Sequence, residues 1–152
     1  MEDNTQILSF HAPKEAISMH VNIYRLENGE NWSNIGGGTI SIGAEREPSD
    51  QLTGIFTMQL KKDYAIDFNI TSNGRASYST DSILLDTEIT VSAKKFLMNF
   101  QEIEINKEIP VALMVYDSGK SMESHSLKEY FEPSRFAGMD LVQIVTLTFS
   151  DK

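Results

Sequence analysis

The sequence predicts an all-β protein, an antiparallel β-sandwich or a partly closed barrel of about eight or nine strands. The first reason is the stretch Tyr64–Thr80, whose side chains alternate on both sides of Asn73-Gly74. This dipeptide favours the positive φ angles of a tight hairpin turn. The second reason is that similar alternation recurs between turn signals along most of the chain. The third is that only one short helix is expected, near residues 126–131, where Ser126-Leu127-Lys128-Glu129 has a capping-box pattern before Pro133.

The N-terminal part divides into an arm and the start of a single domain. Residues 1–16 show no period and are interpreted as an N-terminal arm or a short edge segment, ahead of one domain over residues 17–152. A strand is expected from residue 17, because apolar and polar side chains alternate there. Residues 27–30 are interpreted as a turn, and residues 39–44 as a second strand antiparallel to the first.

The rest of the chain is interpreted in the same way. Residues 52–80 predict a three-stranded meander, and residues 83–93 a further strand. Residues 93–105 fit a helical period as well as a strand with a bulge, and the strand is preferred because the neighbouring segments are strands. Residues 110–116 are apolar on both faces, which is typical of a central strand covered on both sides. Residues 139–149 are expected to form the last strand.

Composition excludes several classes of protein. The chain has 152 residues and no cysteine, so disulfides, thiolate metal sites and cysteine nucleophiles are ruled out. The N-terminal residues are acidic and polar, without the basic and apolar regions of a signal peptide. The longest unbroken apolar run is Val111–Tyr116, far too short to span a membrane. A cytoplasmic protein without a membrane anchor is therefore expected.

The charge balance narrows the choice of partner. There are 22 acidic against 13 basic side chains, a formal net charge of −9. The phosphates of a nucleic acid repel such a surface, and the two basic pairs, Lys61-Lys62 and Lys94-Lys95, do not form a stripe interleaved with aromatics. Nucleic-acid binding is therefore not expected, whereas docking on a basic protein partner or self-association is.

Two glycine motifs are incomplete as phosphate-binding loops. Gly36-Gly37-Gly38 has Ser41 where the dinucleotide fingerprint needs its third glycine, and a strand is expected on both sides of it. A hairpin whose glycines allow close packing is the preferred interpretation. Gly119-Lys120-Ser121 resembles the end of a P-loop, but Met114 stands where the first glycine belongs.

No set of residues predicts catalysis or metal binding. The histidines His11, His20 and His125 have none of the spacings of a zinc site, and the acids Asp86, Glu88, Glu102 and Glu104 lack a calcium-loop pattern. His125 lies between two serines, but sequence order alone does not build a catalytic triad. We therefore expect a protein that is not an enzyme and that uses neither a metal nor a cofactor.

The aromatic residues suggest a possible binding surface, because tyrosine and tryptophan combine apolar area with a polar tip. The alternative is that they are ordinary sheet residues, with Tyr64 and Tyr78 paired across the hairpin. The residues chosen for the surface are Tyr24, Trp32, Gly36, Gly38 and Tyr78.

The same region carries a family resemblance. Val21–Ile42 is similar to the opening hairpin of Ran-binding and EVH1 domains, with an aromatic at Tyr24, Trp32 near the turn, and Gly36 and Gly38 before the second strand. The resemblance covers about one seventh of the chain and would imply binding of a peptide or partner near Trp32. The families end in a helix, whereas a strand is expected here at residues 139–149.

Three functions are consistent with the sequence. The first is a non-enzymatic interaction or assembly module with an acidic surface. The second is a β domain that binds a small molecule or glycan through Trp32 and the tyrosines. The third is an acidic inhibitor or immunity-type protein that blocks a basic enzyme.

Overall fold

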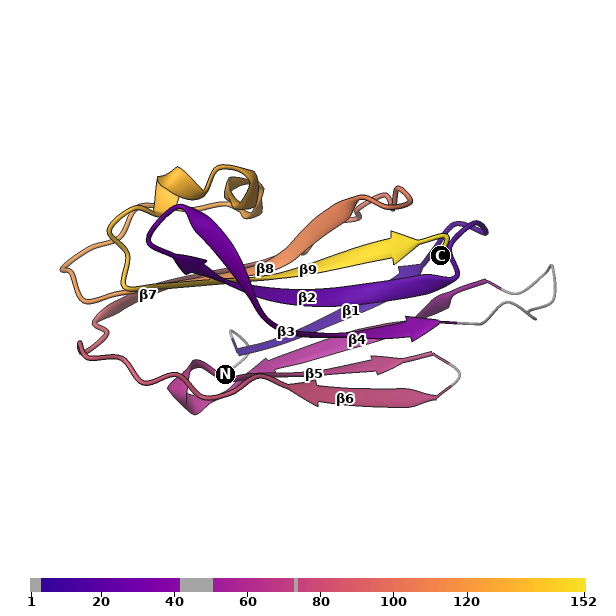
Figure 1. The fold of residues 1–152 in the computed structure, drawn as a ribbon, viewed down its shortest axis with the longest axis horizontal. Helices are drawn as coiled ribbons and strands as arrows, with labels where there is room; N and C mark the ends of the chain where they lie inside the picture. Colours follow the sequence, from indigo (N-terminus) through magenta and orange to yellow (C-terminus); the bar gives the residue numbers. More distant parts are fainter. Residues whose placement is uncertain (1–3, 42–50, 73) are drawn as a thin grey trace.

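The computed structural model describes residues 4–41, 51–72 and 74–152. These residues form nine β-strands in two antiparallel sheets that face each other (Figure 1), and their helical segments are all short 3-10 turns. The strands are β1 (Thr5–His11), β2 (Ser18–Glu27), β3 (Asn31–Ser41), β4 (Thr53–Leu60), β5 (Ile66–Thr71), β6 (Arg75–Ser79), β7 (Val91–Phe96), β8 (Glu108–Asp117) and β9 (Leu141–Ser150). The 3-10 turns are η2 (Lys62–Tyr64), η3 (Leu127–Phe131) and η4 (Pro133–Phe136).

The two sheets have four and five strands. The strand order is β1-β4-β5-β6 in the smaller sheet and β3-β2-β9-β8-β7 in the larger one, and neither sheet closes on itself. The predicted sandwich is therefore confirmed, and the partly closed barrel is not formed. The predicted meander is confirmed as β4, β5 and β6, which pair in sequence order.

The main core lies between the sheets and follows from the alternation of side chains along the strands. Ile66, Phe68 and Ile70 of β5 are each at most 1% exposed, as the pattern of Tyr64–Thr80 predicts. Alternate residues of β2 and β9 meet them from the larger sheet. These include Met19, Val21, Ile23, Val145, Leu147 and Phe149.

A second apolar cluster lies on the outer face of the larger sheet. Leu113 and Val115 of β8 and Val142 and Ile144 of β9 are fully or almost fully buried there under the connection from β8 to β9, which contributes Phe136. Figure 1 shows this connection as the orange-yellow segment above the sheet. The prediction that residues 110–116 form a central strand covered on both faces is confirmed, because one face meets the main core and the other meets this cluster.

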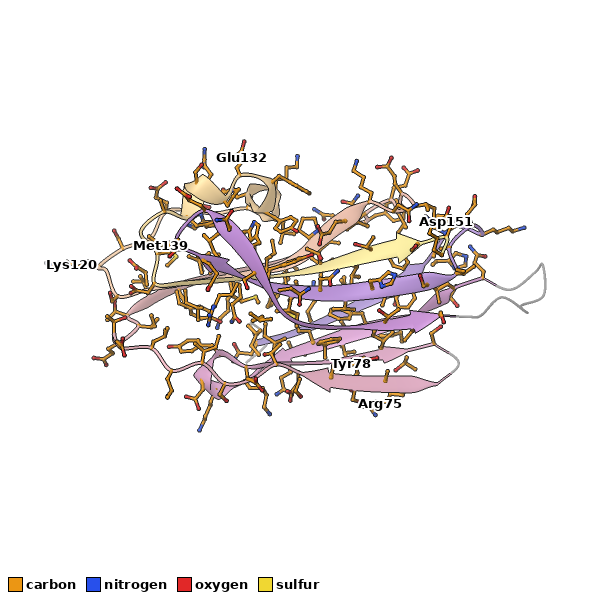
Figure 2. All side chains as sticks on the ribbon, viewed as in Figure 1. Arg75, Tyr78, Lys120, Glu132, Met139 and Asp151 are labelled. Carbon is orange, nitrogen blue, oxygen red and sulfur yellow. The ribbon has the colours of Figure 1, made fainter. Side chains whose placement is uncertain are left out.

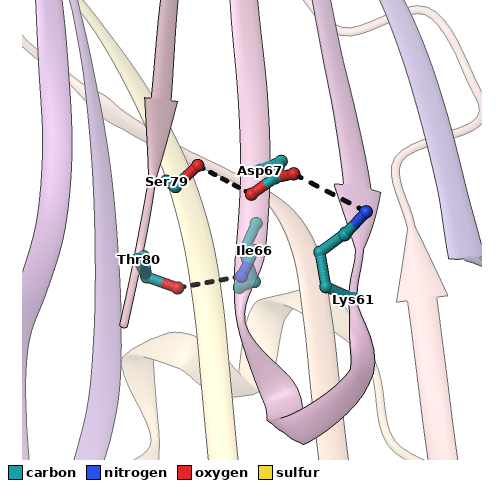
Figure 3. A network of polar contacts seen from close by, with 5 residues as sticks. All are labelled: Lys61, Ile66, Asp67, Ser79 and Thr80. Carbon is teal, nitrogen blue, oxygen red and sulfur yellow. Dashed lines mark hydrogen bonds and ion pairs between the residues drawn. The ribbon is translucent and has the colours of Figure 1, made fainter. Parts of the chain in front are cut away.

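The β5–β6 hairpin is held by polar contacts outside its backbone ladder (Figure 3). The Ile66 amide donates to the Thr80 hydroxyl at 2.8 Å, and the Ser79 hydroxyl donates to the Asp67 carboxylate at 2.7 Å. Lys61 approaches the same carboxylate at 3.9 Å. Asn73 lies outside the described residues, so the predicted Asn73-Gly74 turn is not described.

Several expected elements differ in extent. The expected short helix at residues 126–131 is the 3-10 turn η3, although its capping box between Ser126 and Glu129 is formed as predicted. Residues 83–90 are irregular, and the strand expected over 83–93 begins only at Val91. In the segment 93–105, the strand ends at Phe96 and an irregular stretch follows.

The N-terminal region also has more structure than an unpaired arm. Within residues 1–16, β1 pairs over its whole length with β4 and forms one edge of the smaller sheet. The turn expected at residues 27–30 is confirmed: Asn28 and Gly29 have φ angles of 56° and 69°, and β2 and β3 pair on either side of it. The preceding and following strands therefore form a tight hairpin with both central residues at positive φ.

Candidate functional site

The residues predicted to form one binding surface lie in two separate places. Tyr24 and Trp32 belong to the outer cluster, under the connection between β8 and β9. Gly36, Gly38 and Tyr78 lie where β3 meets β6, at one flank of the sandwich. Figure 2 shows Tyr78 in the lower layer, whereas Glu132 of the connection lies above the upper layer.

Tyr24 takes part in a hydroxyl cluster around one carboxylate. Glu108 accepts hydrogen bonds from the hydroxyls of Tyr24 at 2.7 Å, Tyr130 at 2.6 Å and Thr146 at 2.6 Å. Burial, followed by the hydrogen bond to Glu108 and its negative charge, raises the pKa of Tyr24 and that of Tyr130 above the ordinary tyrosine value. Both phenols are therefore held as neutral donors, and the cluster ties η3 to the sheet.

Trp32 is the second residue of strand β3. Its indole N–H donates to the carbonyl oxygen of Tyr130 at 2.9 Å, and its ring lies 5.4 Å from that of Tyr130 and 6.0 Å from that of Phe136. Both the indole N–H and the ring of Trp32 thus have partners within the chain. Trp32 holds the connection against the sheet, and this role accounts for its environment without a ligand.

The glycines of β3 allow the two sheets to approach closely at one flank. A Cβ atom on Gly38 would lie 2.5 Å from the ring of Tyr78, and one on Gly36 would lie 3.0 Å from the methyl group of Thr80. The Tyr78 ring also stacks on Phe68, with centroids 5.0 Å apart. Between the sheets this flank is therefore closed by packing, as the preferred interpretation of Gly36-Gly37-Gly38 expects. The same glycines also line an open hollow of about 600 Å³, together with His20, Asn22 and Asn34.

His125 is a buried member of the connection. Its Nδ1 lies 2.7 Å from the Glu129 carboxylate, and its ring packs 5.0 Å from that of Phe136. Its Nε2 atom is buried and has no hydrogen-bond partner in the structure. Burial would raise the pKa of Glu129, but hydrogen bonds from His125 and the Ser126 amide, with the charges of His125 and Arg135, lower it below its ordinary value. The pair is buried and does not line the cavity described next.

The opposite flank contains an apolar cavity of about 550 Å³, which we call the flank cavity. It lies between β1 of the smaller sheet and the irregular segment after β7, and β8 and β9 form its floor. Its apolar lining includes Leu8, Phe10, Leu97, Val111, Leu147 and Phe149. Its polar lining includes Ser9, His11, Gln51, Asn99, Gln101 and Glu102.

Two large apolar side chains are exposed in the segment that lines this cavity. Phe100 lines the cavity and is 94% exposed, and Met98, two residues earlier, is 88% exposed. An aromatic ring left in water at the border of an apolar hollow is unusual, because burying it would contribute roughly 1.5–3 kcal/mol. Exposed apolar residues of this kind mark interaction sites when they are grouped rather than scattered.

Sequence reasoning missed the flank cavity. Its two walls, β1 and residues 97–103, are far apart in the sequence, and the contact between them is tertiary: the Gln6 side chain donates to the carbonyl oxygens of Leu97 and Val111 at 3.4 Å and 3.0 Å. One indication of this region came from the sequence: residues 93–105 fit a helical period as well as a strand. Because the two alternatives point side chains in different directions, the orientation of Met98 and Phe100 was not predicted.

Two other arrangements are absent from the described residues. They contain no group of three or more His, Cys, Asp or Glu side chains placed to hold a metal ion. The same residues contain no helix that is long and apolar enough to cross a membrane.

The chain was also compared with known proteins. No family model, no curated protein and no solved structure matches it.

Proposed function

We propose that this protein is a non-enzymatic interaction module that binds a partner protein at the flank cavity. The observation that carries the proposal is Phe100, which is 94% exposed at the border of an apolar cavity that it helps to line. Binding hot spots combine an aromatic anchor with a pocket from which water is excluded. Here the exposed ring and the pocket are adjacent, so one apolar side chain of a partner could contact both.

The charge of the protein defines the chemistry of that partner. The net charge is −9, and Glu102 is the one carboxylate side chain among the described residues that line the cavity. A basic segment would be attracted to this surface, and the attraction would raise its association rate at low salt. The proposed partner therefore presents apolar side chains flanked by lysine or arginine.

The experiment is selection from a phage-displayed library of random dodecapeptides on the immobilised protein. We expect the selected peptides to combine aliphatic or aromatic residues with lysine or arginine. The Phe100→Ser variant should bind the best peptide about tenfold more weakly, because a hot-spot truncation costs more than about 1 kcal/mol. If no peptide is enriched over a blank surface, the proposal is wrong.

Leu84 provides a matched control. It is also 94% exposed, but it does not line the flank cavity. Leu84→Ser removes the same kind of surface as Phe100→Ser and should leave the affinity unchanged. Equal losses in the two variants would show that the peptides recognise exposed apolar surface in general and not this site.

A second function, binding of a small apolar molecule, is favoured by the size of the cavity. Its volume of about 550 Å³ lies within the usual range of ligand pockets, roughly 300–1,000 Å³. An uncharged apolar fluorophore tests it by its emission on titration with the protein. Binding that is tight and unaffected by Phe100→Ser would favour this function over the first one, because a small molecule would be held by the buried lining.

A further inference from the structure

The four sheet edges differ in how they are protected from pairing with another chain. Natural edge strands are guarded by charge, short length, irregular pairing or a cover. β7 carries Lys94 and Lys95, β6 has five residues, and the pairing of β3 with β2 has a register shift beside Ile35. β1 has neither charge nor irregular pairing: residues 5–10 carry no charge and no proline, and all seven residues of the strand pair regularly with β4.

The unguarded edge of β1 borders the flank cavity. Leu8, Ser9, Phe10, His11 and Ala12 all line it, although neighbouring side chains of a strand point to opposite faces. A lining made of consecutive residues means that the strand presents its edge to the cavity, together with its backbone. Within the described residues, this edge of β1 makes no backbone hydrogen bond to another strand.

Contacts at the other end of β1 limit the opening. The Gln6 side chain reaches the carbonyl oxygens of Leu97 and Val111, and Lys94 donates to the Asn4 side chain at 3.0 Å. The first half of β1 is thus tied to the larger sheet. The second half, from Leu8 onward, faces the open cavity.

We propose that the partner segment binds as an extended strand that adds to the free edge of β1 and places alternate apolar side chains in the flank cavity. This inference rests on the proposed function and specifies its geometry. Backbone hydrogen bonds along β1 would supply affinity, and the cavity would select the side chains. The net charge of −9 favours lysine or arginine at the remaining positions.

A second copy of this chain does not fit the site. If two β1 strands paired with each other, Gln6, Leu8 and Phe10 of each copy would remain in its own core, where Gln6 and Phe10 are at most 7% exposed. The copy would offer only the opposite face, with Ile7 and Ser9, and the cavity would stay empty. Two molecules of charge −9 would also repel each other.

The test uses the best dodecapeptide from the library in two N-methylated forms, one methylated at odd and the other at even positions of its central region. Only alternate N–H groups of an added strand point toward β1. We expect one form to bind about 10- to 100-fold more weakly and the other to change less than about threefold. Hydrogen exchange should slow at alternate amides of residues 8–11, the half of β1 that faces the open cavity, when the unmodified peptide binds.

The outcomes separate the two proposals. If no peptide is selected, the proposed function fails, and this inference fails with it. If a peptide is selected but both methylated forms lose affinity equally, or no amide of β1 is protected, the partner binds at the cavity without adding a strand. Concentration-dependent dimerisation that is abolished by Ile7→Lys would assign the edge to a second copy and would also overturn the inference.

Discussion

Gly38 shows how one missing side chain determines the shape of a flank. The Tyr78 ring of the other sheet packs directly against Gly38. A Cβ atom added at this position would lie 2.5 Å from that ring. We predict that Gly38→Ala lowers the free energy of unfolding by about 1–3 kcal/mol, because the ring must leave its stacked position on Phe68. Urea denaturation of the two proteins measures this difference.

A double-mutant cycle isolates the clash from other effects of alanine in a strand. In a Tyr78→Ala background the ring is gone, so the added methyl group at residue 38 has space. Gly38→Ala should then cost less than about 1 kcal/mol. An equal cost in both backgrounds would mean that the backbone of β3, rather than the Tyr78 ring, requires glycine.

Single residues also show what could be predicted from the sequence. The burial of Ile66, Phe68 and Ile70 was predicted correctly, because a period of two follows from the geometry of the strand itself. The environment of Trp32 was not, because its partners Tyr130 and Phe136 are about 100 residues away and only the tertiary fold brings them together. A tryptophan at this position indicated a contact that combines apolar area with a hydrogen bond. It did not indicate whether the partner belongs to the same chain or to another molecule.

For secondary-structure elements too, a local sequence pattern predicts burial better than it predicts hydrogen bonding. Ile83, Leu85 and Ile89 were assigned to a strand because they alternate, and all three do pack against the core. Their segment is irregular, because a periodic pattern reports burial and does not require a neighbouring strand for hydrogen bonding. The expected helix at residues 126–131 failed differently: its cap was recognised, but Pro133 leaves room for only one short turn.

The connection between β8 and β9 should respond to acid. The pKa of Glu129 is lowered in the folded protein from an ordinary value of 4.5, so its carboxylate stabilises the fold above about pH 4.5. That stabilisation is lost as the pH falls through the lowered pKa. We predict a change in the fluorescence emission of Trp32, the single tryptophan, over this acidic range. Its indole N–H donates a hydrogen bond to the carbonyl oxygen of Tyr130 in the same connection, so movement of the connection alters its environment.

Glu129→Gln is the matched variant for that measurement. Glutamine keeps the size of the side chain and does not titrate, so the acid step in Trp32 emission should disappear. Far-UV circular dichroism at each pH separates this local event from unfolding of the sheets. Identical emission profiles in the two proteins would show that another group governs the acid response.

At the scale of the whole molecule, the two flanks of the sandwich differ. One is closed by Tyr78 and Thr80 packed against glycines, and the other is open at the flank cavity. The sandwich itself was predictable from local alternation, but this asymmetry depends on the order of strands in each sheet. The contact between Gln6 and Leu97 spans 91 positions, and no local pattern encodes it.

The net charge of −9 should make the stability depend on salt. The described ion pair Lys107–Glu104 is exposed and Arg25–Glu27 is half-exposed, so each contributes only about 0–1 kcal/mol. We expect the general repulsion that follows from the net charge of −9 to outweigh them. Raising the ionic strength from about 0.01 M to about 0.1 M shortens the Debye length from about 30 Å to about 10 Å. We predict that the unfolding midpoint then rises by about 2–4 °C, measured by calorimetry.

A charge-reversal variant tests the cause of that shift. Glu88→Lys with Glu123→Lys alters two exposed positions and changes the net charge from −9 to −5, because each reversal adds two positive charges. The midpoint of this variant at low salt should be higher than that of the natural sequence, and its dependence on salt should be weaker. If the midpoint falls as salt is added, the prediction is wrong. The stabilisation by local ion pairs would then be larger than the destabilisation by the overall repulsion.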